Sequence, residues 1–114
     1  MHLHPNPFRK IKEGSQQIET RIYDEKRRQF KIGDSIEFIS RENPEDKFLV
    51  EITDLIIKPT FSELFDTFPS ELFGGKDKED LMGIYKYYSP QEEKDFGVVG
   101  IKVRLIDSLE QSKK

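Results

Sequence analysis

A short polar segment near the N-terminus carries the side chains best suited to ligand chemistry, and residues 14–21 read GSQQIETR. In a β-strand, residues i and i+2 point the same way, so Glu19 and Arg21 share one face. Gln17 and Tyr23 extend that face at either end. A carboxylate can accept hydrogen bonds from a base or ribose, and a guanidinium fork matches phosphate oxygens. The alternative is a structural ion pair on a plain strand face.

Positive charge is concentrated in one segment, Lys26, Arg27 and Arg28, followed closely by Lys31. Taken alone, this segment fits a solvated loop with ion pairs to its acidic neighbours. Its place after the Glu19–Arg21 strand makes it a candidate rim for phosphate groups.

Three tyrosines offer rings on which a base could stack. Tyr85 and Tyr88 lie at helical spacing, which favours burial, so Tyr87 is the ring expected at the surface. Tyr87 is therefore the candidate stacking residue.

Other chemistries find less support in the sequence. The chain has no cysteine, which removes thiolate metal sites and cysteine nucleophiles, and it has no Gly-x-Ser-x-Gly or phosphate-loop motif. His2 and His4 lack a third ligand at a recognised spacing, so we expect neither a metal nor a cofactor. The acidic run Glu92 to Asp95 is interpreted as a solvated helix face.

The composition indicates one small soluble domain. The chain has 114 residues, 34% hydrophobic and 36% charged, with nine Phe and four Tyr to supply buried area. Net charge is −3, so any binding of nucleic acid must depend on a local pocket, because bulk positive charge is absent. No apolar run approaches the length of a membrane span, and we expect a cytoplasmic protein.

Short elements must position these residues. We expect a helix with Asn6 as N-cap and Pro7 at its first position, ending at Gly14. Alternating apolar residues predict strands at 17–23, 35–40, 47–57 and 97–106.

Helices are expected between the last two strands. Capping-box patterns at Thr60–Glu63 and Ser89–Glu92 predict two of them, and Asp77 begins another. The resulting fold class is α+β, a short sheet curled into a small barrel with helices covering its open end and one side. Residues 108–114 are expected to fray.

The pattern Gly14-x-Gln16-x-x-Glu19-x-Arg21 resembles the Gly-x-Lys-x-x-Glu-x-Arg signature of the ASCH domain, the activating signal cointegrator homology domain. The resemblance extends over roughly residues 3–106. Its further blocks are Pro7-Phe8-x-x-Ile11, Gly33-Asp34-x-Ile36-x-Phe38 and Gly97-Val98-Val99-Gly100-Ile101.

The resemblance implies a PUA-like small β-barrel, mixed or antiparallel, with a cleft for RNA or a nucleotide-like molecule. Some small ASCH proteins are amidohydrolases on acetylated cytidine. They use the motif lysine, and they carry a threonine at the position of Glu19; this chain has Gln16 in place of that lysine, so neither position matches. A ribonuclease activity is also associated with the family.

We therefore expect residues 1–107 to form a binding module, as a monomer or weak homodimer, for RNA or a nucleotide-like small molecule. An alternative is a hydrolase on a modified nucleoside or RNA, with Glu19 as acid or base. A protein-interaction domain is a third possibility, if Phe61, Phe65 and Phe73 form an exposed patch. The candidate ligand-binding residues are Gly14, Gln16, Glu19, Arg21, Tyr23, Lys26, Arg27, Arg28 and Tyr87.

Overall fold

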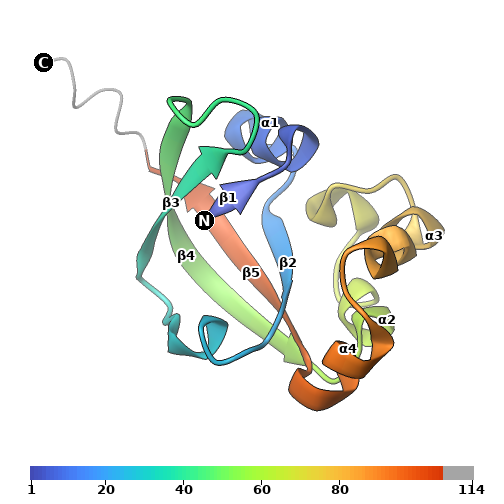
Figure 1. The fold of residues 1–114 in the computed structure, drawn as a ribbon. Helices are drawn as coiled ribbons and strands as arrows, with labels where there is room; N and C mark the ends of the chain where they lie inside the picture. The colour runs from blue at the N-terminus through green and yellow to red at the C-terminus, as the bar shows by residue number, and fades with distance from the viewer. Residues whose placement is uncertain (107–114) are drawn as a thin grey trace, which may run out of the picture.

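A curled five-stranded sheet forms the centre of the molecule (Figure 1). The computed structural model describes residues 1–106, and the tail expected at 108–114 lies outside them. The strands occur in the order β1-β3-β4-β5-β2; β1 runs parallel to β3, and the other neighbours are antiparallel. They are β1 (His2–Leu3), β2 (Ile18–Ile22), β3 (Ser35–Ser40), β4 (Lys47–Lys58) and β5 (Val98–Leu105).

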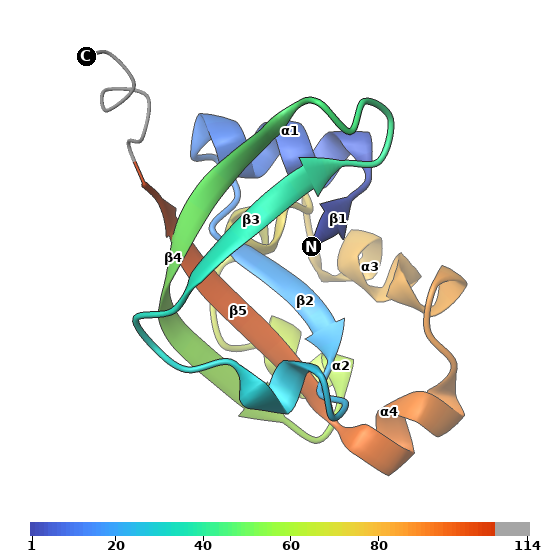
Figure 2. The ribbon, with the colours of Figure 1, turned by 60° about the vertical axis from the view of Figure 1, so that its left-hand side comes forward.

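The long strand β4 bends the sheet into a half-barrel. Its first half pairs with β3 and its second half with β5, and the register shifts between Ile52 and Asp54. A bulge of this kind bends a strand and increases its twist. The curl leaves β1 and β2 as the two edges of the sheet, facing each other across an opening (Figure 2).

Alternation along the strands explains the core inside the half-barrel. Phe38, Val50 and Ile101 have no exposed surface there, and they pack with Phe8 and Ile11 of helix α1 (Pro5–Glu13). This helix ends at Gly14, as expected, because Gly14 adopts the left-handed conformation with φ of 91°.

The start of α1 differs from the expectation. The helix begins at Pro5, and the N-cap is His4, whose side chain makes no capping hydrogen bond. Asn6 and Pro7 lie inside the first turn instead. The reason is long-range: β1 pairs with β3 through Leu3 and Ser40, and the chain turns into the helix directly afterwards.

The helices between β4 and β5 pack on the outer face of the sheet (Figure 1). Thr60 and Ser89 cap two of them as expected, and only Ser89 forms the full reciprocal box. These elements are α2 (Phe61–Phe65), α3 (Lys78–Leu81) and α4 (Pro90–Phe96), with the 3₁₀ helices η2 (Ser70–Phe73) and η3 (Met82–Lys86). A further 3₁₀ helix, η1 (Arg27–Gln29), lies in the connector between β2 and β3.

Three phenylalanines of the segment between β4 and β5 are interior. Phe61, Phe65 and Phe73 are all buried in a second apolar cluster with Ile18 and Ile22 of β2. The exposed patch on which the protein-interaction alternative depended is therefore not formed by these rings, because they complete the packing of the helices on the sheet.

The acidic run of α4 is also not uniformly solvated, and the expectation was wrong at Glu93. This residue is buried, and its Oε2 accepts hydrogen bonds from the Phe61 amide at 2.7 Å and from the Tyr85 hydroxyl at 2.8 Å. A single carboxylate thus joins α2, η3 and α4. None of the helices within residues 1–106 has the length and apolar character needed to cross a bilayer.

Candidate functional site

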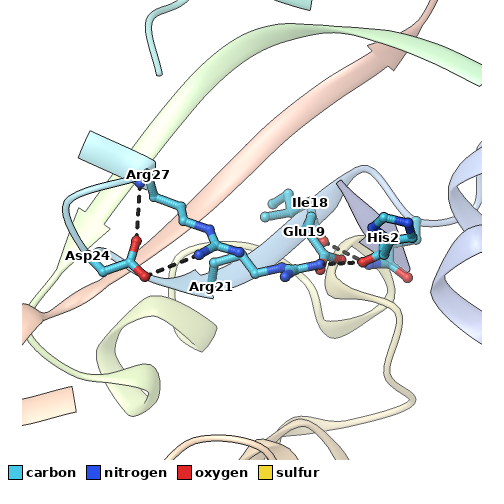
Figure 3. Close-up of polar contacts among 7 residues, drawn as sticks. His2, Ile18, Glu19, Arg21, Asp24 and Arg27 are labelled. Atoms are coloured by element: carbon cyan, nitrogen blue, oxygen red, sulfur yellow. Dashed lines mark hydrogen bonds and ion pairs between the residues drawn. The ribbon is translucent and has the colours of Figure 1, made fainter. Parts of the chain in front are cut away.

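Arg21 spans the opening between the two edge strands. Its Nε donates to Oε2 of Glu19 on the same strand at 2.8 Å, and its second terminal nitrogen donates to the His2 carbonyl of β1 at 3.0 Å (Figure 3). A side chain therefore connects two strands that are not neighbours in the sheet order. This contact fixes β1 relative to β2 and sets the width of the opening.

A cavity of about 640 Å³ lies at this opening, bounded by the edge strands, α1 and the segment from η2 to η3. Its volume is in the range typical of small-molecule sites. Its lining includes His2, His4, Lys10, Gln16, Glu19, Arg21, Arg41, Gly74, Asp80, Lys86, Tyr87 and Tyr88.

The Glu19–Arg21 pair is nearly withdrawn from solvent, with side chains 11% and 13% exposed. Burial raises the pKa of Glu19 above its ordinary value, and the charge and hydrogen bond of Arg21 oppose part of that rise. Burial, the largest single influence, would lower the pKa of Arg21, but the Glu19 carboxylate and the Tyr88 hydroxyl together outweigh it, so the net shift is upward. The guanidinium therefore stays charged, and it presents a fixed cation to the cavity.

Two tyrosines form one side of the cavity. Tyr87 is 64% exposed, as expected, and its ring centroid lies 5.3 Å from that of His4. Tyr88 is half-buried and stacks on Phe61. Burial raises the pKa of the Tyr88 hydroxyl, and the nearby Arg21 charge opposes that rise. Tyr87 is thus the ring available for stacking on a ligand, whereas Tyr88 is packed into the side of the cavity.

Gln16 is buried at the edge of the cavity. Its side-chain amide donates to the Ile18 carbonyl at 2.9 Å, and its Oε1 lies against Gly74. A Cβ at Gly74 would lie 2.3 Å from that oxygen, so the contact requires glycine there. Lys10 reaches the same place from α1, because its Nζ donates to the Gly74 carbonyl at 2.8 Å.

The basic connector lies outside the cavity lining. Arg27 pairs with Asp24 at 3.1 Å (Figure 3), and Arg28 lies over the ring of Tyr23, 4.3 Å from its centroid. Tyr23 itself packs against the core inside the half-barrel. The charge of Arg27 nevertheless acts on the cavity, because it opposes part of the rise in the pKa of Glu19.

Of the nine candidate residues, the structure brings four together in the cavity lining: Gln16, Glu19, Arg21 and Tyr87. Gly14 lies instead in a second hollow of about 420 Å³ beside β5, where Lys102 and Arg104 also lie. Tyr23, Lys26, Arg27 and Arg28 are absent from both linings.

Sequence reasoning missed several lining residues that come from distant elements. Lys10, Arg41 and Lys86 add positive charge to the cavity, and Asp80 adds a carboxylate. With histidines neutral, four basic and two acidic side chains line it, so the cavity is positive in a protein whose net charge is −3. Of these residues, only Lys10 could have been proposed from the sequence, because it lies one helical turn before the Gly14 motif.

Within residues 1–106, no three histidine, cysteine, aspartate or glutamate side chains gather in a group that could hold a metal ion. The side chains of the cavity are suited to hydrogen bonding, to charge pairing and to stacking.

An open half-barrel with a polar cavity at its free edges places the protein in the α+β class of PUA-like folds. Residues 1–107 match the ASCH domain, and the chain belongs to that family. It is similar to the crystal structure of hypothetical protein PH0355, with 31% identity and a TM-score of 0.79, over 93% of this chain and 96% of that one.

A second solved structure, the solution structure of protein PF0455 from Pyrococcus furiosus, shares 26% identity and a TM-score of 0.67. The alignment covers 94% of this chain and 99% of that one. No functionally curated protein matches the chain.

Proposed function

We propose that the cavity binds RNA or a nucleotide-like small molecule and that the protein acts as a binding module. One observation carries the proposal: a net-positive cavity, with a fixed guanidinium and an exposed aromatic ring, occurs in an acidic protein. Membership of the ASCH family supports an RNA-type ligand.

Each wall of the cavity has a role in this proposal. Arg21 contacts phosphate or ribose through N–H groups beyond the two that bind Glu19 and His2. Glu19 holds the guanidinium in position and offers its other carboxylate oxygen to a base or ribose hydroxyl. Such contacts fix orientation, and they are strong because the pair is shielded from water.

Tyr87 supplies the stacking surface for a base. Its ring is mostly exposed and lies beside His4, so a planar ligand can cover it without displacing the core. Stacking on an aromatic side chain is worth about 1–3 kcal/mol per base. The connector residues Lys26, Arg27 and Arg28 form an outer rim that a longer RNA would reach.

Fluorescence anisotropy with labelled single-stranded RNA, at about 50 mM and about 200 mM salt, tests this function. We expect binding that weakens at higher salt, and Tyr87→Ala should weaken it by about five- to a hundredfold. Phe96→Ala is the matched control, since Phe96 is an exposed aromatic residue outside the cavity lining. No binding at low salt, or equal losses in the two variants, would refute the proposal.

A second candidate function, hydrolysis of a modified nucleoside or RNA, is favoured by one observation. Glu19 is a buried carboxylate in the cavity with a raised pKa, a property of many acid–base residues. A screen of acylated nucleosides and RNA, with Glu19→Gln as the comparison, tests it. Turnover that Glu19→Gln abolishes supports a hydrolase, and turnover equal in both proteins assigns the activity elsewhere.

A further inference from the structure

Gln16 lies at the edge of the cavity but is not placed to bind an anion. Its amide donates to the carbonyl of Ile18, two residues further along the chain, and its oxygen is packed against Gly74. The residue is 5% exposed. A neutral, buried carboxamide with these contacts holds the Gly14–Ile18 turn against η2, and any anion in the cavity must be neutralised by other residues.

Lys10 brings an ammonium group to the same place from a different element. Its Nζ binds the Gly74 carbonyl at 2.8 Å, and it lines the cavity with Glu19 and Arg21. This contact uses one of three N–H donors of the ammonium. Within residues 1–106, the side chain makes no other hydrogen bond and no ion pair, so its charge is not neutralised by a carboxylate.

The position of Lys10 is fixed by the end of α1. Its backbone carbonyl accepts from the amides of Gly14 and Gln16, both at 3.1 Å, and from the Ser15 hydroxyl at 3.3 Å. The base of the side chain is thus anchored by the turn, and its tip is anchored by Gly74. A lysine side chain that is held at its base and at its tip loses little conformational entropy when its ammonium group contacts a ligand.

We propose that Lys10 contacts the phosphate of the ligand, so that the cavity selects nucleotides over nucleosides. This inference rests on the proposed function and specifies its ligand class. The second fixed cation of the lining, Arg21, comes from β2, and the Gly74 contact holds the Lys10 ammonium beside the end of η2. The anionic part of the ligand therefore lies toward α1, and the base lies toward Tyr87.

The experiment compares the four ribonucleoside 5′-monophosphates with their nucleosides, in titrations followed by NMR chemical shifts. The variants are Lys10→Met, which keeps the aliphatic stem, and Lys10→Arg, which keeps a cation. Lys12→Met is the matched control, because Lys12 lies on the same helix but is exposed and pairs with Asp46 at 3.5 Å outside this cavity.

Wild type and Lys12→Met should bind monophosphates more tightly than nucleosides. Lys10→Met should weaken monophosphate binding by about ten- to a hundredfold, the size expected for a charge-assisted hydrogen bond, and leave nucleoside binding unchanged. Lys10→Arg should keep part of the preference. Unchanged nucleoside binding also shows that the variant is folded.

The inference is overturned if wild type shows no preference for monophosphates, or if Lys10→Met keeps the preference of Lys12→Met. In both cases ligands still bind and the proposed function stands. If wild type binds neither nucleotides, nucleosides nor RNA, the proposed function fails and the inference fails with it.

Discussion

Replacing Arg21 with methionine tests the buried ion pair at the centre of the site. The Glu19 and Arg21 side chains are nearly buried and their charged atoms lie 2.8 Å apart. Methionine retains much of the aliphatic volume, but it leaves the Glu19 carboxylate buried without a counter-charge. It also removes the contact to the His2 carbonyl that connects β1 to β2.

The expected loss in free energy of unfolding is about 3–5 kcal/mol, the usual cost of breaking a buried pair by removing one partner. The pair Arg9–Glu13 of α1 provides the control. Its atoms are 3.4 Å apart and its side chains are 56% and 54% exposed, so Arg9→Met should cost less than about 1 kcal/mol.

Urea denaturation of wild type and both variants measures these losses, and the double variant Glu19→Gln/Arg21→Met separates the pair from the surrounding packing. Removing the buried charge together with its partner should restore part of the stability. The loss in Arg21→Met should also shrink at acid pH, where Glu19 becomes protonated. A loss below about 1 kcal/mol, or one equal to that of Arg9→Met, would refute a buried pair at this position.

Three further outcomes follow from the structure. Burial raises the pKa of Glu19 above its ordinary value of 4.5, so protonation of this carboxyl favours the folded state. The free energy of unfolding of the wild type, taken relative to that of Glu19→Gln, should therefore fall as the pH rises from 4.5 through the raised pKa, and then level off. Burial and the hydrogen bond to Glu93 raise the pKa of Tyr85 to about 12. Ultraviolet titration should therefore show one tyrosine that ionises late, and Glu93→Gln should return its pKa toward 10. A titration curve that Glu93→Gln leaves unchanged would contradict the contact. Gly74→Ala should be more destabilising than Gly14→Ala in thermal unfolding. Both glycines have φ near +90°, but only a Cβ at Gly74 would meet a side chain. Equal losses of stability in the two variants would exclude the close packing at Gly74.

Much of the fold was predictable from the sequence because its signals are local. The alternation of residues 35–40 and the Ser89 capping box each lie within a few residues, and both appear as expected. The start of α1 was not predictable in this way. It depends on the pairing of β1 with β3, and no residue near Asn6 or Pro7 indicates that this pairing forms.

The candidate site was predictable only where one strand carries it. Glu19 and Arg21 are two residues apart, so their shared face follows from strand geometry. Lys10 meets Gly74 across 64 residues, and Glu93 meets the Phe61 amide across 32. Contacts at such separations depend on the packing of whole elements, and a charged residue in an acidic run gives no local sign that it will be buried.

A crystal structure with a bound ribonucleoside monophosphate or short single-stranded RNA tests the central proposal most directly. We expect ligand density in the cavity between β1 and β2, with the base on Tyr87, sugar or phosphate contacts to Arg21, and phosphate within hydrogen-bonding distance of the Lys10 ammonium. Ligand density confined to the connector around Arg28, or to the hollow beside Lys102, with none between Arg21 and Tyr87, would contradict it.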